Sequence, residues 1–140
     1  MSFTLLFILR TFIATVLGFI LGIQREVSGK PAGSRTIALV TLGSAVYTIM
    51  SAYGFSGITL DPSRVAAQIV VGVGFLGAGV IIFHQDKLVG VTTAATLWVA
   101  ASIGMIVGLG YYLEAGFVCL LTLLLLMLAR LNSNGHWFNH

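Results

Sequence analysis

Charged side chains are scarce in this sequence. Of its 140 residues only seven are Lys or Arg and four are Asp or Glu, which amounts to 8% of the chain, whereas soluble globular proteins carry about 25%. Hydrophobic residues make up 58%, and 17 glycines add to the apolar share. So few charges cannot cover the surface of a soluble globule of this length. The composition therefore excludes a soluble monomer and indicates an integral membrane protein.

Cysteine and acidic residues are equally rare, and each scarcity removes a class of function. The single cysteine, Cys119, excludes an intramolecular disulfide framework and a multi-cysteine metal site. No nucleophile–base pair, paired carboxylate or phosphate-binding loop is recognisable, so we expect no enzyme and no cofactor. The formal net charge is +3, but the basic residues are spread along the chain, so no nucleic-acid partner is expected. Whether any metal binds stays open.

Five apolar runs predict the architecture. A membrane-spanning helix needs about 20 apolar residues, and the runs occupy residues 3–23, 37–55, 65–83, 92–109 and 111–129. We therefore predict an all-α fold, a polytopic transmembrane helix bundle with five spans. It forms one transmembrane domain over residues 1–131, followed by a short cytoplasmic tail over residues 132–140. No predicted span carries an acidic residue near its centre, as a proton-coupled exporter would need.

Lys and Arg in the connecting segments predict the orientation of the spans. With the N-terminus outside, the inner segments carry five basic residues and the outer segments carry one, Arg64. The five are Arg25, Lys30, Arg35, Lys87 and Arg130. This bias predicts an N-out/C-in topology. Arg10 lies inside the first span, where it either snorkels to the outer interface or forms a buried ion pair with Glu114 or Asp61.

Glycines recur at helical spacing in three of the predicted spans. Lipid gives helices no hydrophobic reason to associate, so small residues that let backbones approach closely mark packing faces. A G-x-G-x-x-G string begins at Gly72, but it lies inside an apolar run and lacks the context of a nucleotide site. We predict packing, within one chain or between copies, at Gly18, Gly22, Gly72, Gly74, Gly77, Gly79, Gly104 and Gly108.

Polar residues at the starts of the third and fourth spans have two interpretations each. Asp61-Pro62 is a helix-start signature, which favours a structural cap over a ligand site. Arg64 and Gln68 share one helix face, and Gln68 is expected to point into the bundle. There it would make either an interhelical hydrogen bond, worth about 0.6 kcal/mol, or part of a polar pocket. Thr93 opens the fourth span on a face expected to be buried.

Three blocks of the chain also carry recognisable strings. They read GIQRE and KPAGSRT (residues 22–26 and 30–36), DPSRVAAQIV and GVGFLGAGVI (61–70 and 72–81), and GVTTAATLWV and IGM (90–99 and 103–105). In this order and spacing the blocks resemble the MgtC/SapB family of bacterial membrane proteins. The resemblance is specific, because long runs agree rather than scattered glycines.

The resemblance implies a multi-pass protein of the bacterial inner membrane, linked to magnesium limitation, acid stress, intracellular survival and virulence. It also implies regulation through membrane contacts, including contacts with the F-type ATP synthase, although family members were once called magnesium-transport proteins. The matching residues that would carry such a role are Arg25, Glu26, Arg35, Asp61, Arg64, Gln68 and Thr93. Longer members have a cytoplasmic domain after the last span, and we expect none here.

The chain departs from the family pattern at three positions. Gln24 stands where Glu is common, which weakens a cation site in that loop. Ser34 replaces a usual Leu, and Val89 replaces a usual basic residue that Lys87 can substitute.

Two functions therefore remain open. The first is a regulatory or interaction protein, homo-oligomeric and in contact with the lipid bilayer and other membrane proteins. The alternative is a transporter or channel for Mg²⁺ or a small anion, with a site near Asp61, Arg64 and Gln68. Mg²⁺ is held by one or two carboxylates, and Asp61 is the best-placed one, whereas the adjacent Arg64 suits an anion better.

Overall fold

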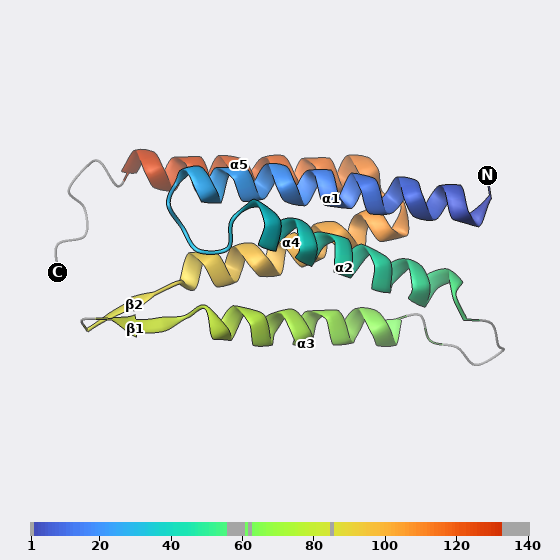
Figure 1. Ribbon diagram of the computed structural model, residues 1–140, viewed down its shortest axis with the longest axis horizontal. Coiled ribbons are helices and arrows are strands. Elements are labelled where there is room, and N and C mark those ends of the chain that lie inside the picture. The colour runs from blue at the N-terminus through green and yellow to red at the C-terminus, as the bar shows by residue number, and fades with distance from the viewer. Residues whose placement is uncertain (1, 56–60, 62, 85, 133–140) are drawn as a thin grey trace.

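Five helices and one short hairpin make up the part of the chain that the structure describes (Figure 1). The computed structural model describes residues 2–55, 61, 63–84 and 86–132. The elements are α1 (Phe3–Val27), α2 (Ser34–Tyr53), α3 (Ser63–Gly79), β1 (Ile82–His84), β2 (Lys87–Val89), α4 (Val91–Leu109) and α5 (Tyr112–Asn132). The helices run lengthwise. At one end, the hairpin end, α1 finishes, α2 and α4 begin and the hairpin lies, whereas α3 begins at the opposite end.

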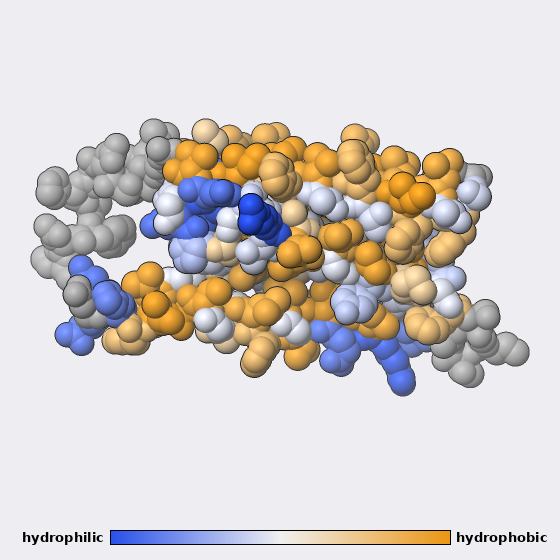
Figure 2. All heavy atoms as spheres, viewed as in Figure 1, coloured by the Kyte–Doolittle hydropathy of each residue, from blue (hydrophilic) through white to orange (hydrophobic). Residues whose placement is uncertain are grey.

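Apolar side chains cover the outside of the bundle, and several polar ones lie inside it. Phe12, Phe75 and Leu113 are 66%, 80% and 87% exposed, whereas Thr41 and Thr48 are buried. Figure 2 shows hydrophobic residues over most of the visible face, along α1 and α5 in particular. A soluble protein has the reverse distribution. An apolar exterior of this kind is stable only when lipid covers it.

Among the residues whose side chains the structure describes, three helices are long and apolar enough to cross a membrane: α1, α2 and α4. The apolar stretches described in α3 and α5, residues 63–79 and 112–128, are shorter than these. The predicted all-helical membrane architecture is therefore confirmed in its coarse form. The five-span count and the N-out/C-in orientation stay predictions.

The core forms where α4 packs against α1 and α2. Ala100, Ile103 and Val107 of α4 are fully buried there. The buried threonines satisfy their hydroxyl groups on their own helix: Thr41 Oγ1 donates to the Ile37 carbonyl at 3.1 Å, and other threonines repeat this bond. Because a hydroxyl satisfied in this way leaves no unpaired polar group, these polar residues can face the interior.

Glycines bring the three central helices into close backbone contact. A Cβ added at Gly108 would lie 2.8 Å from Thr48 Cβ, and one at Gly104 would lie 2.9 Å from Ser44 Cβ. Real Cβ atoms do not approach other heavy atoms so closely, so each position requires glycine. On α1, Gly18 and Gly22 meet α2 with equally little space. The structure therefore places these four glycines at helix–helix contacts within the chain.

The glycines of α3 behave differently. Gly77 faces Ala94 of α4 at ordinary contact distance, 3.5 Å between the added Cβ and Ala94 Cβ. Gly72, Gly74 and Gly79 would each meet nothing within 4 Å. These three glycines therefore make no close helix contact with the described residues of the chain, and contact between copies stays a prediction.

One face of α3 is buried, and it is not the face that carries Gln68. Ile69, Val73 and Gly77, four residues apart, pack onto the bundle, whereas Gln68 is exposed. The expectation that Gln68 points into the bundle is therefore wrong for this chain. The reason is that α3 packs on α4 through the neighbouring row, where Gly77 meets Ala94, so the Gln68 row stays on the outside.

The third helix ends at Gly79, four residues earlier than Phe83, where its predicted span ended. Instead of a plain loop, Ile82–His84 pairs antiparallel with Lys87–Val89, with Ile82 opposite Val89. Gly90 follows with φ +96°, and a Cβ there would collide with the Val80 carbonyl group. Only glycine fits this left-handed position, at which the chain changes direction between the hairpin and α4.

Candidate functional site

The structure separates the seven predicted site residues into two groups. Arg25, Glu26, Arg35 and Thr93 lie at the hairpin end, on the last turn of α1 and the first turns of α2 and α4. Asp61, Arg64 and Gln68 lie at or near the beginning of α3, at the opposite end of the bundle. The two groups therefore lie too far apart to form a single site.

Arg25 and Thr93 are brought together from positions 68 residues apart. The Arg25 side chain is 3% exposed and the Thr93 side chain 2%. Arg25 Nη2 donates a short hydrogen bond of 2.5 Å to Thr93 Oγ1. The Nε atom of Arg25 is buried and has no hydrogen-bond partner among the described residues. The guanidinium is thus fixed at the start of α4, and its Nε–H group remains unpaired there.

A cavity of about 750 Å³ opens beside this pair. We call it the Arg25 cavity. It is lined by Gln24, Arg25, Val27, Ser28, Lys30, Pro31, Lys87, Leu88, Val89, Gly90, Val91, Thr92, Thr93 and Leu126. Its wall therefore combines the end of α1, the segment between α1 and α2, strand β2, the first turn of α4 and one residue of α5.

The charges around the Arg25 cavity are of one sign. Arg25, Lys30 and Lys87 line it, and no lining residue is acidic. Glu26, next to Arg25 in the chain, is engaged elsewhere: its Oε2 accepts from the Ser34 backbone N–H at 3.2 Å and from Ser34 Oγ at 2.6 Å. Glu26 thereby caps the first turn of α2, which gives this candidate residue a structural role.

The first turn of α4 adds to the positive potential of the cavity. Its first internal hydrogen bond runs from the Ala94 N–H to the Gly90 carbonyl at 2.9 Å. The N–H groups of Val91, Thr92 and Thr93 come before it and find no acceptor within their own helix. Gly90 at the N-cap has no side chain to cap them. A helix N-terminus carries a partial positive charge, so the cavity suits an anionic group and not a metal cation.

At the opposite end, Asp61 has the structural role of a cap. Its Oδ1 accepts from the Ser63 backbone N–H at 2.9 Å and from Ser63 Oγ at 2.6 Å. These hydrogen bonds hold the pKa of the Asp61 carboxyl below its usual range. Arg64 is exposed, as is Arg35 at the other end. Within the described part of the chain, no group of three or more His, Cys, Asp or Glu could hold a metal ion.

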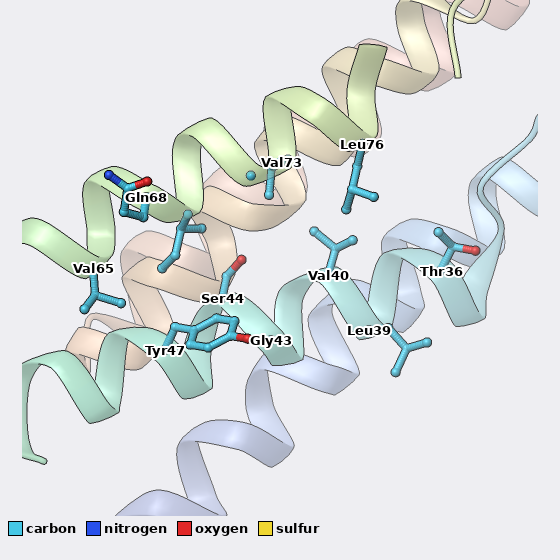
Figure 3. A pocket seen from close by; sticks show the side chains of 12 residues that line it. Thr36, Leu39, Val40, Gly43, Ser44, Tyr47, Val65, Gln68, Val73 and Leu76 are labelled. Atoms are coloured by element: carbon cyan, nitrogen blue, oxygen red, sulfur yellow. The ribbon is translucent and has the colours of Figure 1, made fainter. Parts of the chain in front are cut away.

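Gln68 lies on the wall of a groove between α2 and α3. This α2–α3 groove has a volume of about 670 Å³. Its lining residues are Thr36, Leu39, Val40, Gly43, Ser44, Tyr47, Val65, Gln68, Ile69, Gly72, Val73 and Leu76. Figure 3 shows Val40 of α2 and Leu76 of α3 pointing toward one another across it. The groove is mainly apolar, and Gln68 supplies one of its few polar groups.

Arg10 follows neither of its two predicted alternatives: it does not snorkel, and among the described residues it forms no ion pair with Glu114 or Asp61. Its side chain is 7% exposed, and Nη1 donates to the Gly108 carbonyl at 2.7 Å. Its Nε donates to Tyr112 Oη at 3.4 Å, and the guanidinium carbon lies 5.2 Å from the centre of the Tyr53 ring. A carbonyl group and two aromatic rings therefore replace the carboxylate partner, because Arg10 reaches the C-terminal, negative end of α4.

Sequence reasoning did not include Lys30, Lys87 or Gly90 among the candidate site residues. The structure shows that all three line the Arg25 cavity. A signal was present, because Lys30, Lys87 and the start of α4 were all predicted to lie on the inner side. Their common cavity could not be derived from it.

An apolar exterior around membrane-length helices defines the class of this chain, a helical membrane protein. The MgtC family model matches residues 11–134, and the chain belongs to the MgtC family. This confirms the resemblance that the three sequence blocks carry. No solved structure matches the chain.

Curated relatives agree with this assignment. Over 126 residues the chain is 45% identical to "Putative magnesium transporter YhiD" of Escherichia coli K12, covering 86% of this chain and 59% of the relative. It is 42% identical to "Protein SapB" of Bacillus subtilis (84% and 53%). It is 44% identical to "Protein MgtC" of Salmonella typhimurium (78% and 46%). The chain thus spans about half of the length of these relatives.

Proposed function

We propose that this chain is a bacterial inner-membrane regulatory protein of the MgtC type that acts by binding other membrane proteins. The family membership supports this class of function. The proposal depends mainly on the α2–α3 groove, an open apolar surface beside a helix whose outward glycines meet nothing in the chain. We propose that the groove takes a transmembrane helix of another membrane protein.

The character of the groove favours a helix as its occupant. Gly43 and Gly72 leave room on its two walls, so a partner backbone can approach closely, as in other glycine-lined helix contacts. Gln68 and Ser44 offer hydrogen bonds that a partner side chain can use and a lipid chain cannot. A contact of this kind fits the regulatory role in magnesium limitation, acid stress or intracellular survival that the family resemblance implies. It makes the F-type ATP synthase one partner to test.

The proposal includes five spans with the hairpin end in the cytoplasm. Arg25, Lys30, Arg35 and Lys87 all lie at that end, and basic residues favour the cytoplasmic side. Cysteine labelling of intact cells at an exposed position of the hairpin, His84, tests this orientation. We expect a cysteine at this position to be labelled only after the inner membrane is opened. Labelling in intact cells would contradict a cytoplasmic hairpin end.

Photo-crosslinking tests the partner helix. A photoreactive phenylalanine at Leu76, inside the groove, is compared with the same residue at Leu113, which is 87% exposed on α5. We expect an adduct with one identified membrane protein from Leu76 alone, and its loss when Gly72→Leu fills the groove. Adducts with a second copy of the chain, or with lipid alone, would contradict the proposal that the groove takes a helix of another membrane protein. Adducts with a second copy would instead locate the predicted homo-oligomer contact in the α2–α3 groove.

Ion transport is the alternative, and it is favoured by the name of the YhiD relative, which calls that protein a magnesium transporter. The Asp61 carboxylate that was to bind Mg²⁺ already accepts two hydrogen bonds from Ser63. Flux of Mg²⁺ and of small anions into liposomes containing the purified chain decides between the two functions. We expect no flux above that of empty liposomes, and flux abolished by Asp61→Asn would establish the alternative.

A further inference from the structure

We propose that the Arg25 cavity binds a phosphate-type oxyanion, supplied either as free inorganic phosphate or as the phosphate of a lipid headgroup. This inference does not depend on the α2–α3 groove or on the partner proposed for it. It depends on three features of the cavity: the first turn of α4, the buried guanidinium of Arg25, and the amide of Gln24 with the lysines around it.

The start of α4 supplies the first feature. Val91, Thr92 and Thr93 line the cavity, and their backbone N–H groups have no acceptor in their own helix. Most helices place Ser, Thr, Asp or Asn at the N-cap so that a side-chain oxygen satisfies these donors. Here Gly90 occupies the N-cap and offers none. Helices that leave their N-terminal donors open in this way are suited to binding phosphate.

Arg25 supplies the second, independent feature. Only 3% of Arg25 is exposed, and the hydrogen-bond partner of its guanidinium is the neutral Thr93 hydroxyl. Its Nε–H group is buried without a partner. A buried charge is costly unless it is paired, and no acidic residue lines the cavity. An anion beside Arg25 would supply the missing counter-charge.

Gln24 narrows the class of anion. Its Nε2 donates to Ser28 Oγ at 3.3 Å, whereas its Oε1 is buried without a partner. A ligand that carries an O–H group as well as negative oxygens can satisfy both this acceptor and the N–H donors of the cavity. Hydrogen phosphate has both, whereas sulfate at neutral pH has no proton to donate. Lys30 and Lys87, both exposed, add charge from two further segments.

Thermal unfolding of the full chain in detergent tests the free anion. Sodium phosphate, sodium sulfate and sodium chloride are compared at equal ionic strength, so that screening is the same in each. A ligand that binds only the folded state raises the melting temperature in a saturable manner. We expect phosphate to do so, sulfate to do so more weakly, and chloride to have no effect.

Two single variants show whether the Arg25 cavity is responsible. Lys87→Gln removes a charge that lines the cavity, and Arg35→Gln removes an exposed charge at the same end that does not line it. We expect Lys87→Gln to weaken phosphate binding about tenfold, as loss of one charge-assisted contact does, and Arg35→Gln to leave it unchanged. Equal effects of the two would overturn the assignment. Arg25→Gln should abolish phosphate binding. The test depends on Lys87→Gln instead, because Lys87 is exposed and its replacement leaves the buried core unchanged.

A lipid arm separates the two sources of phosphate. The chain is placed in nanodiscs of phosphatidylcholine with or without phosphatidylglycerol, and bound lipid is counted by native mass spectrometry. The site would belong to a lipid headgroup if the chain retains phosphatidylglycerol, if Lys87→Gln reduces this retention, and if inorganic phosphate does not raise the melting temperature. If neither inorganic phosphate nor phosphatidylglycerol is distinguished from chloride and phosphatidylcholine, the proposal is wrong.

Discussion

Arg10 of α1 and Gly108 of α4 are joined across 98 residues of sequence by a buried hydrogen bond of 2.7 Å from Nη1 to the carbonyl oxygen. The bond places a permanent cation at the C-terminal end of α4, where the helix dipole is negative. Tyr53 and Tyr112 complete the surroundings of the guanidinium. Four segments of the chain therefore meet at one side chain.

Replacing Arg10 by Met should destabilise the bundle. The Gly108 carbonyl loses its charged donor, and hydrogen bonds to charged groups contribute about 1.5–3 kcal/mol. We expect a loss of about 2 kcal/mol in unfolding free energy, measured by denaturant titration in detergent, and a smaller loss for Arg10→Lys. Arg64→Gln, an exposed charge at the same end, is the control, and a loss as large as that of Arg10→Met would contradict the assignment.

Two glycine-to-alanine variants should have opposite effects on stability. At Gly104 a methyl group would collide with the Thr41 carbonyl group and Ser44 Cβ, whereas at Gly72 it would meet nothing within 4 Å. Overpacking costs about 1–3 kcal/mol, and alanine in an open helix position gains up to about 1 kcal/mol over glycine. Thermal unfolding of both variants measures the difference. Equal melting temperatures would show that α2 and α4 are not packed as described.

Thr93→Val should destabilise the chain by removing the hydrogen bond between α1 and α4 that Thr93 accepts. Valine has the shape of threonine but cannot accept the hydrogen bond from Arg25, so the buried guanidinium would lose its partner. Leaving a charged group unsatisfied costs at least about 1–3 kcal/mol, and Thr93→Ser should restore most of it. The matched control is Thr92→Val, because Thr92 is exposed. If both valine variants unfold alike, the Arg25–Thr93 bond contributes nothing to stability.

The Asp61 cap should make the start of α3 sensitive to acid. The pKa of its carboxyl is lowered in the folded state by the bonds from Ser63. Its stabilisation is therefore complete above the ordinary pKa of about 4 and is lost as the pH falls through the lowered value. Hydrogen exchange at Ser63 and Arg64 between pH 6 and pH 3 should show this loss of protection. In Asp61→Asn the protection should be lower and independent of pH, and a pH dependence that persists would exclude Asp61 as its source.

The sequence predicted the helices where the pattern is local. The runs at residues 3–23, 37–55 and 92–109 became α1, α2 and α4 with small shifts at their ends. Spacing also identified Gly18, Gly22, Gly104 and Gly108, and these four stand at close helix contacts. Such features depend on residues within a few turns of each other, so a single sequence contains them.

Predictions that needed a choice between two faces or two distant partners were less successful. On α3 the rows of Gln68 and Ile69 differ by one residue, and only the position of α4 decides which is covered. The Arg25 cavity was not predicted because its lining residues come from segments that are far apart in the sequence. Its donors come from α1, the hairpin and α4.

Composition and apolar run length alone determined that this chain is a helical membrane protein, because eleven charges cannot solvate its surface and each run approaches the thickness of a bilayer. The strings of residues 22–105 determined its family. Only the tertiary structure decided that Arg25 meets Thr93, that Arg10 meets Gly108, and that the outward glycines of α3 stay uncovered in this chain. These contacts join residues 68 and 98 positions apart, and such pairings follow from how whole helices pack, which no local pattern specifies.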